Sequence, residues 1–136
     1  MAALTAPRNT PERRGALREP PVKASTVIHQ GSLVAIDATG YAVPAATATT
    51  LKVIGRAEQS ADNSSGADGA IRVRVEAGIF RWDNSASSDA IALSDVGADC
   101  YAVDDHTVAK TSGTNTRSVA GKIHDVDALG VWVRTI

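Results

Sequence analysis

The sequence of 136 residues contains a single cysteine, Cys100, so no disulfide can form within the chain. Disulfides are the usual staples of small secreted domains, and their absence favours a reducing compartment. No apolar run approaches the roughly 18 to 20 residues of a membrane-spanning helix, and the first residues lack the apolar segment of a signal peptide. We therefore expect a soluble protein that is made in the cytoplasm.

Strong charge of one sign is also missing. The formal net charge at pH 7 is only −1, which gives no overall attraction to nucleic acid or to anionic lipid. Aromatic residues make up only 4% of the chain, so the core has to be built from Val, Ile, Leu and Ala. Such a core is thin, which favours a protomer that is stabilised by an oligomer or by a larger surface. Phe80, Trp82 and Trp132 are the candidate residues for this contact.

Proline is scarce beyond residue 25, because Pro44 is the only proline in that part of the sequence. The first 25 residues hold the other four prolines and five basic against two acidic side chains, a local charge of +3 that leaves −4 for the rest. Because proline lacks the N–H group and fixes φ, this composition disfavours both a helix and a central strand. The sequence predicts an extended arm over residues 1–25 and a folded domain over residues 26–136. The arm is either a disordered leader or a segment that becomes ordered along a partner.

Short runs of alternating apolar and polar residues are plentiful, and the most regular ones lie in residues 118–136. Two such runs flank Asp127-Ala128-Leu129-Gly130. Asp accepts a hydrogen bond from the backbone two residues on, and Gly tolerates positive φ, so we expect a hairpin with a loop of roughly three to five residues. The last strand needs a partner. Residues 27–37 and 71–82 are the candidates, which would bring both ends of the domain into one sheet.

Similar runs upstream predict many short strands. Residues 70–83 alternate most clearly, with a bulge or bend expected at Gly78, and Gly55 indicates a bulge or a close backbone approach within residues 52–59. Residues 87–89 resemble a helix N-cap, but the chain after them leaves room for about one helical turn. We predict an all-β domain: a compact antiparallel β-barrel or β-sandwich with an extended N-terminal arm and at most one short helical turn.

Asp104-Asp105-His106 is the only local cluster of carboxylates with an imidazole. Neighbouring residues on a strand point to opposite faces, so its last two residues are not expected to converge, and a hairpin turn with a solvated histidine is the simpler interpretation. Residues 60–69 carry acidic and amide side chains, but a calcium loop needs a Glu where Val73 stands. Cys100 suits a small buried position. The sequence thus predicts no catalytic, cofactor-binding or metal site, and no enzyme.

Several motifs together resemble the capsid cement, or decoration, proteins of tailed bacteriophages and their prophages. The resemblance covers about residues 22–133, and its most specific pieces are Asp95–Gly97, Tyr101–Val108, Val119–Ile123 and Gly130–Val133. It implies a small β-rich domain, usually trimeric, that adds to the outside of a matured head and has no catalytic or cofactor residues. Its partners would be the major capsid protein and further copies of itself, and it would be located on the outer capsid surface of the virion.

In that family the N-terminal arm often lies along neighbouring shell subunits, although here it is longer and richer in Arg and Pro than the family pattern. The resemblance then implies a capsid-binding arm of Arg8, Arg13, Arg14, Arg18, Pro20, Pro21 and Lys23, with Phe80, Trp82 and Trp132 as oligomer or shell contacts. The alternative is a free-standing β-barrel module that binds sugar or peptide on a platform of Trp82 and Trp132. A third interpretation, an enzyme that uses the cluster at residues 104–106, has little support in the sequence.

Overall fold

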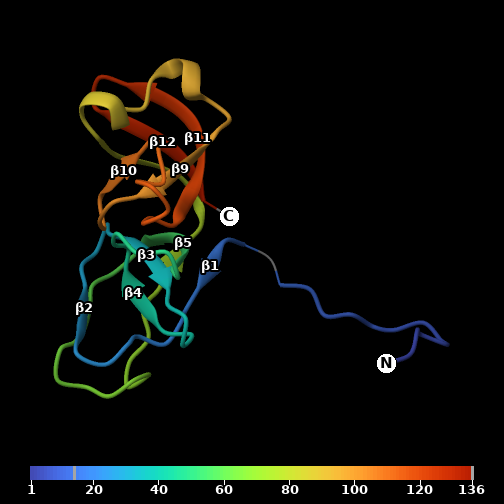
Figure 1. Ribbon diagram of the computed structural model, residues 1–136. Helices are drawn as coiled ribbons and strands as arrows, with labels where there is room; N and C mark the ends of the chain where they lie inside the picture. Colours follow the sequence, from blue (N-terminus) through green and yellow to red (C-terminus); the bar gives the residue numbers. More distant parts are fainter. Residues whose placement is uncertain (14, 136) are drawn as a thin grey trace.

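The computed structural model describes residues 1–13 and 15–135, which form an all-β molecule of two lobes (Figure 1). The predicted fold class is confirmed. No helix of the length and apolarity that a membrane span needs occurs among the described residues. The strands are Leu17–Arg18 (β1), Thr26–Ile28 (β2), Leu33–Ile36 (β3), Ala42–Pro44 (β4), Lys52–Ala57 (β5), Ala61–Asn63 (β6), Val75–Glu76 (β7), Gly78–Asn84 (β8), Asp99–Ala102 (β9), Thr107–Ala109 (β10), Val119–Asp127 (β11) and Gly130–Thr135 (β12).

The first lobe is an antiparallel sheet in the order β1-β7-β5-β3-β4, accompanied by the β2–β6 pair. Buried and exposed residues alternate along β6, whereas β3 is buried at three consecutive positions because it lies inside the sheet and at the junction with the barrel. Gly55 lies where the register between β3 and β5 shifts, and a Cβ atom at this position would collide with the Glu76 backbone, which confirms the close approach predicted there. The core consists of Val22, Ile28, Val34, Ala42, Ile54, Ala57, Ala61, Val73 and Val75.

The chain joins this lobe at β1, so the folded part begins before the predicted residue 26. β1 pairs with β7. A few residues later the Val22 N–H donates to the Ile71 carbonyl at 2.9 Å, and the Val22 side chain is fully buried in the core. The boundary predicted between residues 25 and 26 is therefore too late in the chain, because β1 and the Ala16 carbonyl, which accepts a hydrogen bond from Ala77, already belong to the sheet.

Pro20 and Pro21 were expected to keep their segment out of a sheet. In the structure they take part as acceptors only, for which no N–H group is needed. The Pro20 carbonyl accepts a hydrogen bond from Val73 at 3.2 Å, and the Pro21 carbonyl accepts one from Ala42 at 2.8 Å. Because Val73 leads into β7 and Ala42 begins β4, the two prolines tie one end of the sheet to the other.

The second lobe is a closed barrel in the order β10-β8-β12-β11-β9. Its strand pairs are antiparallel, except that β8 and β10 run parallel. The hairpin of β11 and β12 confirms the prediction for the C-terminal residues, but Asp127 pairs directly with Gly130, so the loop has two residues and is shorter than expected. The barrel core consists of Leu33, Ala45, Trp82, Ile91, Cys100, Ala102, Val108, Ala120, Ile123, Val131 and Val133.

Two further expectations about the strands are corrected. The two ends of the domain do not meet in one sheet: β12 pairs with β8, as predicted for residues 71–82, but β3 belongs to the other lobe. Residues 70–83 are not one strand, because Ala77 separates β7 from β8. This break lies beside Gly78, where a bend was predicted, and it is where the chain passes from the sheet to the barrel. In place of one helical turn, Ser87–Asp89 (η1) and Leu93–Asp95 (η2) form two separate 3-10 turns.

The passage of the chain from β7 to β8 is one connection between the lobes, and β3 supplies another. Leu33 begins β3 in the sheet, yet its side chain packs in the barrel core. Its N–H donates to the Asp105 carbonyl at 2.7 Å, which ties the start of β3 to the turn between β9 and β10. The two lobes therefore share a waist at which residues distant in sequence lie side by side.

Candidate functional site

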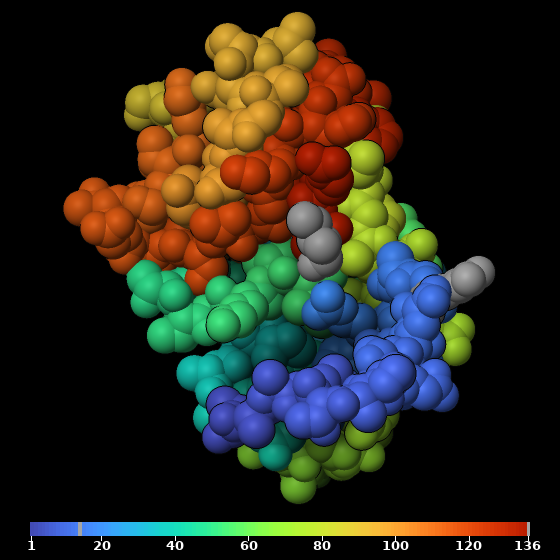
Figure 2. Space-filling view, turned by 90° about the vertical axis from the view of Figure 1, so that its right-hand side faces the viewer, coloured from blue at the N-terminus to red at the C-terminus, as the bar shows by residue number. Residues whose placement is uncertain are grey.

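The projecting arm, which we define as residues 1–13, runs away from both lobes (Figure 1). All of its side chains are exposed. In Figure 2, which faces this side of the molecule, the arm lies in front of the sheet lobe and below the red strands of the barrel. It carries two of the predicted arm residues, Arg8 and Arg13, while Arg14 lies outside the described residues. An exposed extended segment of this kind can gain order by lying along a partner.

The remaining residues of the predicted arm belong to the folded lobe. Arg18 lies on β1 with its side chain exposed. Lys23 forms an ion pair with Asp37, with 2.9 Å between Nζ and Oδ2, and this hydrogen bond raises the pKa of Lys23. Partial burial opposes ionisation of Asp37, but donors from Tyr41, Lys23 and Thr39 outweigh it and hold the pKa of that carboxyl below its usual range. Lys23 is thus already engaged within the fold.

A groove of 470 Å³ opens where the arm meets the body. Leu17 and Ile79 contribute apolar surface to it, and they are 50% and 40% exposed. Arg13, Arg18 and Arg134 also line it, and none of the three has an ion-pair partner within residues 1–13 and 15–135. Unpaired guanidinium groups around apolar surface favour a partner that carries carboxylates beside apolar side chains. Sequence reasoning missed Arg134, Leu17 and Ile79, because only the fold brings them together: Leu17 lies on β1, which pairs with β7, and Ile79 and Arg134 face each other across the β8–β12 pair.

The three aromatic candidates differ in their placement. Trp82 is only 5% exposed and packs inside the barrel, so the prediction that it forms a surface contact is wrong. Phe80 packs against the same core and lies under Arg56, whose guanidinium carbon is 4.1 Å from the ring centre. Trp132 lies on the outer side of the barrel wall, with Arg81 5.6 Å from its ring centre.

Because Trp82 faces the barrel interior, it forms no platform with Trp132. Phe80 and Trp132 line a hollow of 430 Å³ together with Arg56 and Arg81, and Trp82 borders it with only 5% of its surface exposed. The Trp132 Nε1–H donates to Asp127 Oδ2 at 2.8 Å, and this bond lowers the pKa of Asp127. Phe80 and Trp132 remain available for a contact with another molecule, whereas Trp82 contributes to stability.

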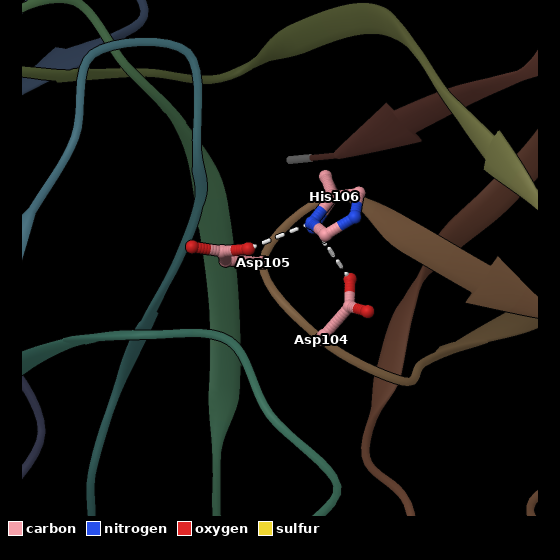
Figure 3. Close-up of side chains that lie close together, drawn as sticks. All are labelled: Asp104, Asp105 and His106. Carbon is pink, nitrogen blue, oxygen red and sulfur yellow. Dashed lines mark hydrogen bonds and ion pairs between the residues drawn. The ribbon is translucent and has the colours of Figure 1, made fainter.

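Asp104, Asp105 and His106 lie in the turn between β9 and β10, as the hairpin prediction has it, and the histidine is exposed. The expectation that their side chains do not converge is wrong. The backbone bends at all three residues, so strand alternation does not apply, and both carboxylates turn toward the imidazole (Figure 3). The hydrogen bond that the imidazole donates to Asp105, together with the charge of Asp104, raises the pKa of His106.

Cys100 is fully buried in the barrel, as predicted, and burial followed by the charge of Asp99 raises the pKa of its thiol to about 12. The thiol is therefore not a nucleophile at neutral pH. The loop 60–69 holds a buried residue that sequence reasoning missed. The Asn63 side-chain amide lies within hydrogen-bond distance of the carbonyls of Val22, Lys23 and Ala67, at 3.2, 2.9 and 2.9 Å, and so fastens the start of the folded chain to this loop.

Arg13 belongs both to the arm and to the lining of the groove, which also includes Arg18, while the cluster at residues 104–106 lies at the waist. Comparisons with known protein families, with curated proteins and with solved structures found no match to this chain.

Proposed function

We propose that this chain is a structural decoration protein that binds the outside of a matured phage head and stabilises it by cross-linking subunits of the major capsid protein. The motifs that resemble cement proteins motivate the proposal. The observation that carries it is the projecting arm, whose exposed side chains include Arg8 and Arg13 and whose root opens into the groove lined by Arg18 and Arg134. A compact body with a long projecting segment suits a molecule that spans neighbouring subunits.

A decoration protein acts through differential affinity. It binds the expanded shell more tightly than the precursor, and it stabilises the state that it binds by mass action. Many copies on a symmetric lattice turn a modest contact per copy into a large total. We propose a homotrimer as the bound unit, with Phe80 and Trp132 as candidate contacts between copies or with the shell.

The alternative function, a module that binds sugar or peptide, required Trp82 and Trp132 to form one aromatic platform. Trp82 is only 5% exposed and packs in the barrel core, so it offers little of the aromatic surface that such a platform needs. The arrangement of the aromatic residues therefore favours the decoration function.

The test is to mix the full chain with expanded and with unexpanded heads of the phage or prophage that encodes it. We expect co-sedimentation with expanded heads only, and image reconstruction should place density in threefold clusters on the outer surface. Equal binding to both kinds of head, or binding to neither, would contradict the proposal. Sedimentation of the free chain at micromolar concentration tests the oligomer separately, because a compact monomer would exclude a preformed trimer.

A further inference from the structure

We propose that the tip of the β11–β12 hairpin in one copy of the chain inserts into the groove of a second copy, so that the chain associates head to tail. The hairpin tip is defined as residues 125–129, and the groove is the hollow at the root of the arm. The inference rests on the homotrimer of the proposed function and names the surfaces that join its copies, but the free chain is sufficient to test it.

The hairpin tip presents acidic and apolar side chains together. Asp125 and Asp127 are exposed, and neither forms an ion pair within the part of the chain that the structure describes. The hydrogen bond from Trp132, followed by weaker effects that include the charge of Arg81, lowers the pKa of Asp127, so this carboxylate is ionised at neutral pH. Leu129 is 71% exposed, more than any other large apolar side chain described outside the arm.

The hairpin tip is also held in one shape before it meets a partner. Asp127 pairs with Gly130, and its Oδ1 accepts hydrogen bonds from the N–H groups of Leu129 and Gly130 at 2.8 and 3.1 Å. Asp125 Oδ1 accepts another from the Val126 N–H at 2.8 Å. A surface that is ordered in advance loses less conformational entropy on binding, which favours association.

The groove is complementary to this surface. Leu17 and Ile79 form its exposed apolar part, and the guanidinium groups of Arg13, Arg18 and Arg134 lie around them. Its volume of 470 Å³ falls in the range of pockets that enclose small ligands, so it has room for the few side chains of a hairpin tip. A basic rim around an apolar centre matches carboxylates that flank a leucine.

Other segments of a second copy suit the groove less well. Residues 1–13 carry two arginines against one glutamate, so the arm of another copy would add positive charge to a basic groove. Leu93 and Val96 are exposed beside η2, but the nearby Asp95 carboxylate is only 15% exposed and pairs with Lys110 at 3.4 Å. The hairpin tip therefore has the chemistry that fits best.

The hairpin tip and the groove lie at opposite ends of β12. Gly130 begins this strand beside the tip, whereas Arg134 and Thr135 line the groove. At about 3.3 Å per residue, Leu129 and Arg134 are separated by roughly 16 Å along the strand, so one copy cannot fill its own groove with its own tip. A contact between two different surfaces closes into a ring when the rotation between copies allows it. A ring of three copies uses every tip and every groove once.

The experiment is sedimentation of the full free chain at micromolar concentration in about 0.1 M salt. The test variants are Leu129→Ser and Asp125→Lys on the tip and Arg134→Glu in the groove. The matched controls, Leu93→Ser and Asp83→Lys, make the same kinds of change at exposed positions outside both surfaces. We expect the wild type and both controls to form the same oligomer, and each test variant to associate at least about tenfold more weakly.

A charge exchange tests whether the two surfaces meet each other. The chain that carries Asp125→Lys together with Arg134→Glu again has opposite charges on the tip and in the groove. It should therefore associate more tightly than either single variant, which is the coupling expected of residues in contact. Both positions are exposed, so the variants should fold, and their melting temperatures in the monomeric state check this directly.

A monomeric wild type would overturn the inference, and so would tip variants that associate like the wild type or a charge exchange that recovers nothing. Binding to heads separates these failures from those of the proposed function. A monomer that still decorates expanded heads would refute the contact between copies and leave the decoration function standing. An oligomer that depends on the tip and the groove but binds no head would refute the decoration function alone.

Discussion

Asn63 illustrates, at the scale of single residues, how one buried amide can join distant parts of this chain. It is 3% exposed, and its Nδ2 group faces three backbone carbonyl oxygens. Replacement by Asp keeps the shape but places a carboxylate oxygen against these carbonyls. We expect Asn63→Asp to lower the free energy of unfolding by about 3 kcal/mol or more, measured by urea denaturation at pH 7.

The matched control for this substitution is Asn115→Asp, the same chemical change at an exposed position. Its effect should stay within about 0.5 kcal/mol. A similar loss in both variants would mean that added negative charge, rather than the unsatisfied carbonyls around Asn63, causes the destabilisation.

The lowered pKa of Asp37 predicts that the stability of the fold depends on pH. Its pKa is lower in the folded chain than in the unfolded chain, so the ionised carboxylate contributes stability that is fully present above the unfolded pKa, about 4, and is lost as the pH falls through the lower folded value. The substitution Asp37→Asn removes the charge and keeps one oxygen acceptor. The stability difference between wild type and variant should therefore be greatest near neutral pH and should shrink below about pH 4. Melting curves recorded between neutral and acidic pH measure it, and a constant difference would show that the charge has no role.

Single residues could be predicted from the sequence where their role is local. Asp127 accepts hydrogen bonds from Leu129 and Gly130, at 2.8 and 3.1 Å, as its place before a turn indicates. Roles that depend on distant partners could not be predicted. Trp82 has a surface-like polar neighbourhood in sequence, and only the closure of the barrel buries it. Arg134 likewise becomes a groove residue only through the meeting of β1, β8 and β12.

At the scale of elements, the segment before β2 decides where the fold begins. Removal of residues 1–13 should leave the melting temperature unchanged, because these side chains are exposed and the first strand starts at Leu17. Val22→Ala should cost about 1.5 to 3 kcal/mol, since the side chain is fully buried. Removal of residues 1–24 should destabilise the chain further, because it also deletes β1 and the proline carbonyl acceptors. A stable truncation at residue 24 would contradict this assignment of the boundary.

The strands themselves were largely predictable, but their partners were not. The β11–β12 hairpin joins neighbours in sequence, so its pattern and turn residues were sufficient. The assignment of β3 to one lobe and β12 to the other depends on contacts between distant residues, which periodicity does not encode. The proline-rich segment was misjudged for a physical reason: the missing N–H group excludes donation only, and Pro20 and Pro21 pair through their carbonyl oxygens.

At the scale of the whole molecule, basic residues gather on the side from which the arm projects. Arg8 and Arg13 lie on the projecting arm, and Arg18 and Arg134 lie at its root, while the chain as a whole carries a net charge of −1. In the proposed decoration function, this separation would orient the molecule toward an acidic surface, since exposed charges act mainly within a Debye length of about 10 Å at 0.1 M salt. Under the same proposal, exposed apolar residues such as Leu17 and Ile79 would supply contacts that do not depend on salt.

The charge on the arm can be tested through its salt dependence. Replacement of Arg8 and Arg13 by Ala should weaken binding to expanded heads, and the ratio of wild-type to variant affinity should be larger at about 0.02 M than at about 0.3 M salt, because screening is weaker at low salt. The control is Lys52→Ala, which removes an exposed positive charge from β5 at a residue that belongs neither to the arm nor to the groove lining. Co-sedimentation at both salt concentrations measures the affinities. Some binding should survive in the arm variant, since apolar contacts and backbone pairing with a sheet edge do not require charge. If the affinity ratio does not change with salt, or if Lys52→Ala reproduces the effect, the arginines act through shape or through overall charge, and the contact with the shell must be sought on the body around Phe80 and Trp132.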